Sequence, residues 1–233
     1  MKTITTLITA LFLTFASPVF AQEFFSTETP QQLFNIGFRL GVNTSNRTFP
    51  KGAFNRWNTN GWGTGVEAGC VVDINIRDFI SIQPGFFAGT RSDTYAYAHS
   101  YYDVYGEKDD FSQMGRNRAF SFTIPIMASF RFNLSPSVRL IAEAGPYVEY
   151  FLSNTAKEKI IVLNRQTSID DLVEGTTAHP SKGDYGFKIG AGISFRRHYS
   201  FHIHYLAGCR HAWSTPLTGG HNKQWLFTVG YDL

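Results

Sequence analysis

The sequence predicts an all-β protein, an eight-stranded antiparallel transmembrane β-barrel, on three observations. Apolar and polar residues alternate in eight segments, the connections between these segments alternate between long and short, and an export signal begins the chain. A strand directs successive side chains to opposite faces, so alternation indicates a strand with one apolar and one polar face. Such strands suit a membrane if lipid covers the apolar face and a closed barrel pairs every strand edge.

The N-terminus has the parts of an export signal. Lys2 supplies a positive charge, residues 4–15 are apolar, and Val19 and Ala21 are small residues at the offsets of a cleavage site. We expect cleavage after Ala21, with residues 1–21 as the signal peptide, 22–33 as a periplasmic segment and 34–233 as the barrel domain. No later run approaches the roughly 18 apolar residues of a spanning helix, so insertion into a membrane would require a barrel.

The composition agrees with this interpretation. The chain is 16% aromatic and 17% charged, and its net charge of +3 is too small to indicate a nucleic-acid partner. Its mean hydropathy of −0.16 resembles that of a soluble protein. A transmembrane barrel has a similar value, because half of each strand and all of the loops are polar.

Four strands are predicted in the first half, over residues 34–43, 62–74, 79–90 and 119–132. Their apolar faces are, in order, Phe34, Ile36, Phe38, Leu40 and Val42; Trp62, Val66, Ala68, Cys70 and Val72; Ile80, Ile82, Phe86 and Ala88; and Phe120, Phe122, Ile124, Ile126, Phe130 and Phe132. Glycine, small polar and charged residues occupy the opposite faces. Pro84 and Pro125 fall inside two of these segments and Pro146 inside a later one, and each removes a ladder donor. We therefore expect bulges or shorter strands there.

Four more strands are predicted over 138–152, 184–196, 199–210 and 224–233. Their apolar faces are Leu140, Ala142, Ala144, Val148 and Tyr150; Tyr185, Phe187, Ile189, Ala191, Ile193 and Phe195; Phe201, Ile203, Tyr205 and Ala207; and Trp225, Phe227, Val229, Tyr231 and Leu233. Leu226 is the one apolar residue on the polar face of the last segment.

The connections favour an outer-membrane barrel with periplasmic termini. Short turns are expected near 75–78, 133–137 and 197–198, and long loops at roughly 44–61, 91–118, 153–183 and 211–223. Outer-membrane barrels have short periplasmic turns and long extracellular loops. Tyr95 and Tyr97 alternate with Ala96 and Ala98, which predicts that the third and fourth strands continue above the membrane as a hairpin. The tyrosines of this loop would serve either as interface aromatics or as contacts for a partner.

Glycine decides which face points outward. A soluble barrel of the lipocalin kind also alternates, but its apolar face points inward. Here the glycines recur on the polar face, where a narrow lumen leaves little room, and the large aromatics lie on the other face. The aromatic face is therefore expected to contact lipid.

Several strand segments resemble the PorT-like outer-membrane β-barrel family, a Bacteroidetes-type group of small OmpA-like barrels. The matching segments are Ile82-Gln83-Pro84-Gly85-Phe86, residues 123–130 (Thr-Ile-Pro-Ile-Met-Ala-Ser-Phe), Ala144-Gly145-Pro146-Tyr147-Val148, residues 37–43 and residues 190–193. The resemblance covers the chain from about Leu33. It implies an eight-stranded barrel, and the family's namesake belongs to a protein-secretion and gliding apparatus.

The polar face collects twelve side chains that we expect inside the barrel: Arg39, Glu67, Asp73, Gln83, Arg131, Arg139, Glu143, Glu149, Lys188, His202, His204 and Arg210. Eight strands enclose an interior that side chains just fill. Buried charges must pair, so we expect a salt-bridged plug rather than a pore.

Two histidine patterns in the sequence could form chemical sites. His202 and His204 project to one side of a strand, where Glu143 or Glu149 would lie across the lumen, but two ligands without an identified third predict a polar network rather than a metal site. His198 with Ser200, or His211 with Ser214, would suit a lipid-modifying hydrolase. The first pair is expected at the periplasmic rim, and the second has no carboxylate nearby in sequence.

Cys70 and Cys209 lie in the second and seventh strands, which are not adjacent in an eight-stranded ring. Their Cα atoms should exceed the roughly 7 Å limit for a disulfide, so two free thiols on the lipid face are expected.

The sequence thus predicts a non-enzymatic, monomeric outer-membrane barrel without cofactor, metal or nucleic-acid partner. Its partners would be outer-membrane lipids and a protein held by the extracellular loops, and its role would be in envelope structure or binding, with a place in a secretion system as one option. The alternatives are an outer-membrane lipid-modifying hydrolase and a soluble ligand-binding barrel of the periplasm.

Overall fold

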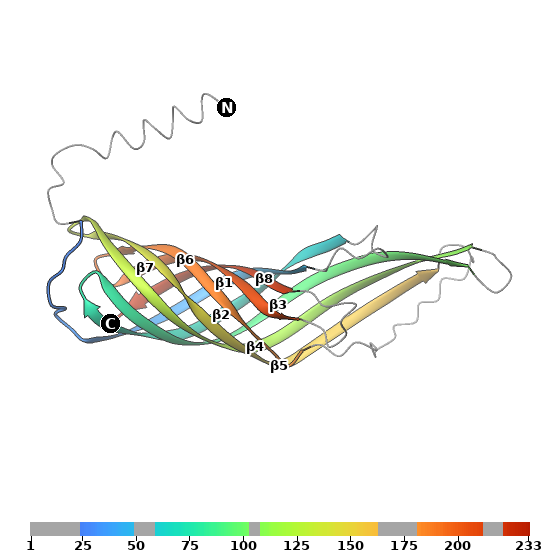
Figure 1. Cartoon of the computed structure of the whole chain (residues 1–233), viewed down its shortest axis with the longest axis horizontal. Coiled ribbons are helices and arrows are strands. Elements are labelled where there is room, and N and C mark those ends of the chain that lie inside the picture. The colour runs from blue at the N-terminus through green and yellow to red at the C-terminus, as the bar shows by residue number, and fades with distance from the viewer. Residues whose placement is uncertain (1–23, 49–58, 103–107, 163–180, 212–220) are drawn as a thin grey trace, which may run out of the picture.

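The computed structural model describes residues 24–48, 59–102, 108–162, 181–211 and 221–233, which form eight strands. The strands are β1 (Phe34–Thr48), β2 (Thr59–Arg77), β3 (Ile80–Tyr102), β4 (Lys108–Ser135), β5 (Val138–Val162), β6 (Gly183–Phe195), β7 (Tyr199–His211) and β8 (His221–Asp232). Each pairs antiparallel with its sequence neighbours, and β1 pairs with β8, so the barrel is closed (Figure 1). The predicted fold class is confirmed. The predicted signal peptide, residues 1–21, lies outside the described residues. No helix in the described part of the chain has the length and apolar character to cross a membrane.

Short turns join the strands at one end, which we call the turn end; the opposite end is the loop end. β2 and β3 are joined at residues 78–79, β4 and β5 at 136–137, and β6 and β7 at 196–198. In the last turn Arg196 and Arg197 adopt left-handed backbone conformations, with φ of 51° and 60°. The predicted turn positions agree with these.

β3, β4 and β5 extend beyond the ring at the loop end (Figure 1). The ladder between β2 and β3 ends at Thr59↔Ala96, whereas β3 and β4 stay paired to Tyr102↔Lys108. β5 stays paired with β4 to Phe111↔Val162, but with β6 only to Tyr150↔Gly183. We call residues 97–102, 108–118 and 153–162 the protruding sheet. The expected β3–β4 hairpin is confirmed, but residues 153–162 were expected to be loop and are strand.

The three mid-strand prolines neither insert a bulge nor end a strand. Pro84 pairs with Ile126, two pairs are then skipped, and the same register resumes at Phe87↔Thr123. Pro125 pairs with Tyr147, and its ladder resumes unchanged at Ala128↔Ala144. Pro146 lies within the unbroken register of β5 and β6. The ladder therefore tolerates the missing donors locally.

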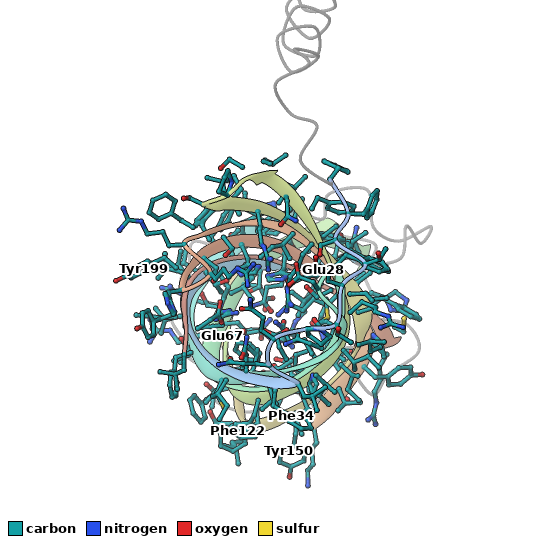
Figure 2. All side chains as sticks on the ribbon, turned by 90° about the vertical axis from the view of Figure 1, so that its left-hand side faces the viewer. Glu28, Phe34, Glu67, Phe122, Tyr150 and Tyr199 are labelled. Atoms are coloured by element: carbon teal, nitrogen blue, oxygen red, sulfur yellow. The ribbon has the colours of Figure 1, made fainter. Side chains whose placement is uncertain are left out.

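The aromatic face points outward, as predicted. Phe38 is 55% exposed and Phe187 66%, whereas their neighbours Arg39 and Lys188 are 7% and 4% exposed. Viewed along the barrel from the turn end, Phe34, Phe122, Tyr150 and Tyr199 point away from the ring, and Glu67 lies inside it (Figure 2). Such an outer surface excludes a soluble barrel with an inward apolar core, because exposed apolar area on this scale requires a lipid cover.

Two side chains differ from the simple alternation. Arg210 was expected in the lumen but is exposed, because the register between β7 and β8 shifts between Ala207 and His211 and a bulge changes which face a residue occupies. Leu226 lies in the lumen, fully buried, and clusters with Tyr147 and Leu206. The lumen therefore contains an apolar layer that the sequence analysis did not anticipate.

Both cysteines are free, as predicted. Cys70 lies on β2 and Cys209 on β7, and β1 and β8 separate these strands around the ring. Cys70 is half-buried and Cys209 is exposed.

The segment before β1 crosses the turn end and is tied to it. Phe24 and Phe25 pack against Phe132, with ring centroids 5.2 and 5.1 Å away; the Phe25 contact is edge-to-face. The backbone N–H of Asp78 donates to the carbonyl of Glu28 at 3.2 Å, and the amide of Asn75 donates to the carbonyl of Gln32 at 2.9 Å. Figure 2 shows this segment, with Glu28, passing in front of the lumen.

Candidate functional site: the polar lumen

The lumen is the place where the fold gathers ionisable side chains. Nine of the twelve predicted residues are buried there: Arg39, Glu67, Asp73, Gln83, Glu143, Glu149, Lys188, His202 and His204. Arg131 and Arg139 are half-buried at the turn end, and Arg210 lies outside. Five of the predicted ionisable residues, Arg39, Asp73, Arg131, Arg139 and Glu149, form ion pairs with oppositely charged side chains.

At the loop end two arginines pair with buried carboxylates. Arg91 Nη1 lies 3.0 Å from Glu149 Oε2, and its guanidinium carbon lies 4.2 Å from the centre of the Phe151 ring. Arg47 Nε lies 3.2 Å from Asp93 Oδ1. Arg47, Arg91 and Asp93 lie beyond the ends of the predicted strands, so they were not among the predicted lumen residues. Arg47 and Arg91 continue the polar face of their strands, so a longer alternation would have included them.

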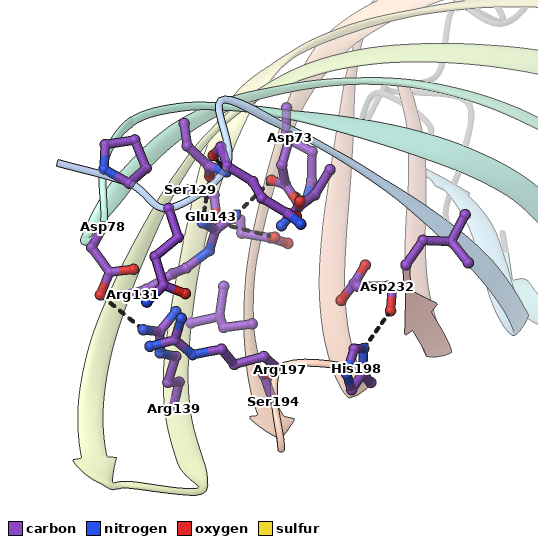
Figure 3. A pocket seen from close by; sticks show the side chains of 18 of the residues that line it. Asp73, Asp78, Ser129, Arg131, Arg139, Glu143, Ser194, Arg197, His198 and Asp232 are labelled. Carbon is purple, nitrogen blue, oxygen red and sulfur yellow. Dashed lines mark hydrogen bonds and ion pairs between the residues drawn. The ribbon is translucent and has the colours of Figure 1, made fainter.

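At the turn end the charges line a cavity of about 300 Å³ (Figure 3). Arg39 pairs with Asp232 at 2.7 Å and Arg131 with Asp73 at 2.7 Å. Arg139 pairs with Asp78 at 2.8 Å, near the mouth. Gln31 and Gln32 of the segment before β1 also line the cavity, so this segment forms part of its wall.

The inner part of this cavity is formed by Glu143 and His202, and His204 lies next to them. Glu143 Oε2 lies 2.6 Å from His204 Nε2 and 3.3 Å from His202 Nδ1. Ser129 donates to the other carboxylate oxygen, Oε1, at 3.4 Å. The two imidazole rings are stacked, with centroids 5.5 Å apart and planes 7° from parallel.

Glycines on β6 allow this cluster to form. Gly190 pairs with Glu143 of β5 on one side and with His204 of β7 on the other. A Cβ at Gly190 would collide with the His204 ring, and one at Gly192 would lie 2.6 Å from His202 Nδ1. Because β6 has no side chain here, groups two strands apart meet across it. The choice between Glu143 and Glu149, which the sequence left open, follows from this register.

The cluster does not have the order of a serine hydrolase. In such enzymes the imidazole stands between the serine and the carboxylate, so that it can accept the hydroxyl proton. Here the carboxylate stands between Ser129 and His204, and the group is buried near the turn end. His198 Nδ1 lies 2.9 Å from the carbonyl of Asp232, also at the turn end (Figure 3). Ser214 and the side chain of His211 lie outside what the structure describes.

Comparison with solved structures finds outer-membrane proteins of low sequence identity. OprG from Pseudomonas aeruginosa has a TM-score of 0.46 at 9% identity, covering 90% of this chain and 99% of that one. The attachment invasion locus protein Ail of Yersinia pestis has a TM-score of 0.33 at 9% identity, covering 87% of this chain and all of Ail. The outer membrane enzyme PagL has a TM-score of 0.38 at 13% identity, covering 83% and 98%. No curated protein sequence matches this chain.

A family model gives the more specific result. The model described as "Outer membrane protein beta-barrel domain" matches residues 20–211, most of the chain. Its description agrees with the closed ring of antiparallel strands and the outward apolar face. The protein is therefore a β-barrel of the outer membrane, and it belongs to the outer membrane protein beta-barrel domain family.

Proposed function

We propose that this protein is a non-enzymatic outer-membrane barrel that anchors a binding surface, the protruding sheet, outside the cell. The observation that carries the proposal is the unequal length of the strands. β3, β4 and β5 have 23, 28 and 25 residues, whereas β6, β7 and β8 have 13, 13 and 12. Because short turns are periplasmic in such barrels, the protruding sheet faces the exterior.

The lumen supports a role as an anchor rather than as a channel. Arg91–Glu149 at the loop end and Arg39–Asp232 at the turn end are buried pairs. The apolar cluster of Tyr147, Leu206 and Leu226 lies between these levels along β5, β7 and β8. An eight-stranded barrel encloses little more than its own side chains. We expect the purified protein to be silent in a planar lipid bilayer.

The hydrolase alternative is not favoured by the described residues. An enzyme acting on outer-leaflet lipid would need a serine, a histidine and a carboxylate in that order at the loop end. The described histidine–carboxylate contacts lie near the turn end, and Ser129 contacts the carboxylate rather than a ring.

The PorT-like resemblance favours a protein partner from a secretion apparatus. That resemblance covers strand segments and no loop, so it supports the partner's class without naming it. A sheet held outside the membrane is a suitable surface for a protein, because its strands are already paired with one another before binding.

The experiment is a pull-down from outer membranes with a shortened variant. Tyr97 and Gln113 are paired across β3 and β4, so residues 98–112 can be replaced by Asn-Gly, a two-residue hairpin turn. Both tagged proteins are first shown to have the same β-sheet circular dichroism. We expect a partner that co-purifies with the full chain and is lost from the variant. Equal recovery with both proteins, or no specific partner with either, would contradict the proposal.

A further inference from the structure

We propose that Glu143, His202 and His204 form a binding site for a divalent transition-metal ion of the Zn²⁺ class. Each residue offers one ligand atom, and these atoms all lie within 4.8 Å of one another. Ligands about 2.0–2.1 Å from a tetrahedral zinc are separated by about 3.3 Å. His202 Nδ1 and Glu143 Oε2 already have a separation of 3.3 Å, and His204 Nε2, now 2.6 Å from the same oxygen, needs only a small shift.

Three ring nitrogens of His202 and His204 have no hydrogen-bond partner among the described residues. His202 is 2% exposed, and its Nε2 has no hydrogen-bond partner among the described residues; the same is true of Nδ1 of His204. His202 Nδ1 is near Glu143 but not in hydrogen-bonding geometry. A buried imidazole with unused nitrogens is costly as part of a polar network. A metal ion would take up one of these nitrogens, Nδ1 of His202, together with Nε2 of His204, which now contacts Glu143. Nε2 of His202 and Nδ1 of His204 would remain for water.

The surrounding charges allow a cation. Glu143 and Glu67 are both buried and both interact electrostatically with Lys188, whose ammonium also lies 4.8 Å from the centre of the Phe87 ring. With neutral imidazoles these three ionised groups sum to one negative charge. Arg39, which lines the same part of the lumen, is paired with Asp232. A divalent ion therefore enters a cluster with an excess of negative charge, and Lys188 lowers the affinity without preventing binding.

An entry path leads from the turn end. Glu143 and His202 line the 300 Å³ cavity that opens there, so a hydrated ion can reach them without opening the barrel (Figure 3). On the other side Tyr147, Leu206 and Leu226 are buried together in the lumen. The site would therefore exchange metal with the periplasm and leave one coordination position for water from the cavity.

The donor set fixes the class of metal. Two imidazoles and one carboxylate suit Zn²⁺, Cu²⁺ or Ni²⁺, whereas Ca²⁺ and Mg²⁺ prefer sets made entirely of oxygen. Three protein ligands with a fourth position open resemble the coordination of catalytic rather than structural zinc. We infer binding alone, because the hydroxyl of Ser129 beside the site donates to Glu143 rather than to an imidazole that could accept its proton.

The test uses the full barrel refolded in detergent, stripped of metal and titrated with Zn²⁺, with Co²⁺ as a spectroscopic substitute. We expect one ion per chain and a visible Co²⁺ spectrum typical of four-coordination. Loss of a residue that only hydrogen-bonds to a metal ligand weakens metal binding by about 10- to 100-fold. His202→Gln and His204→Gln remove a ligand itself, so each should weaken zinc binding by more than this. His198→Gln, which changes an exposed histidine at the mouth, should leave binding unchanged.

A second measurement, made on the natural protein, tests the site even if the histidine variants do not fold. X-ray absorption of the zinc-loaded natural protein should show two imidazole nitrogens and one carboxylate oxygen at about 2.0–2.1 Å. The proposal is overturned by an absence of stoichiometric binding. It is equally overturned if His202→Gln and His204→Gln bind zinc as the natural protein does, if His198→Gln abolishes binding, or if the absorption data show oxygen ligands only.

Discussion

A lysine placed at two depths on the outer face of β8 tests how the barrel sits in the bilayer. Phe227 pairs with Val42 and Ile203 and points outward. It lies between two aromatic pairs, Tyr205–Trp225 with ring centroids 4.9 Å apart and Tyr199–Tyr231 with centroids 5.5 Å apart. Such aromatic residues are typical of the membrane interfaces, so Phe227 is expected near the bilayer centre.

The depth difference follows from strand geometry. Tyr231 is four residues further along the same face, about 14 Å along a strand that rises about 3.4 Å per residue. With a tilt of about 40°, that is about 10 Å along the membrane normal, within an apolar band about 25 Å tall. Phe227→Lys should therefore lower the free energy of unfolding by about 2–4 kcal/mol, and Tyr231→Lys by about 0–1 kcal/mol.

The assay is reversible urea unfolding in phospholipid vesicles, followed by tryptophan fluorescence. Phe227→Leu is the matched control, because it removes the ring but keeps an apolar contact with lipid. Equal losses for the two lysine variants, or a larger loss for Tyr231→Lys, would refute the placement of the apolar band.

Three further outcomes follow from the interior and the cysteines. Arg39→Met should lower the free energy of unfolding by about 3–5 kcal/mol, because it leaves Asp232 buried without its partner. Adding Asp232→Asn should recover part of this loss. If the losses of the two single variants simply add in the double variant, the pairing is disproved. Leu226→Ala should cost about 2–5 kcal/mol by opening a cavity, and an unchanged urea midpoint would place Leu226 outside the lumen. Cys70 and Cys209 should both react with a lipid-soluble maleimide without prior reduction, and a shift in gel mobility on reduction would reveal a disulfide.

The strand cores and the facing of their side chains were predictable because a period of two is a strong local signal. Phe187 and Lys188 are adjacent in β6; Phe187 is 66% exposed and Lys188 is 4% exposed, as the alternation requires. The alternation of apolar and polar residues is absent from the part of the strands that extends beyond the membrane. Residues 153–162 of β5 begin Ser-Asn-Thr-Ala-Lys and show no apolar alternation, because neither face of the protruding sheet has to be apolar.

The details of the site depend on register, which a single sequence does not show. Glu143 and Glu149 occupy the same face of β5, and only the pairing through Gly190 brings Glu143 to His204. The register shift near Arg210 adds two residues to β7 relative to β8 without leaving a sequence pattern. Leu226 appeared as an irregularity in an otherwise regular strand, and the structure shows that it packs inside with Tyr147.

The orientation of the two faces is tested most directly by spin labels along β6. In a variant with serine in place of Cys70 and Cys209, single cysteines are introduced one by one from Tyr185 to Phe195 and labelled in lipid vesicles. Collision with oxygen dissolved in the lipid should peak at Tyr185, Phe187 and alternate residues beyond, and fall at the residues between them, following the alternating burial of this strand. A constant collision rate along the strand, or peaks at the inward residues, would contradict an apolar face in contact with lipid.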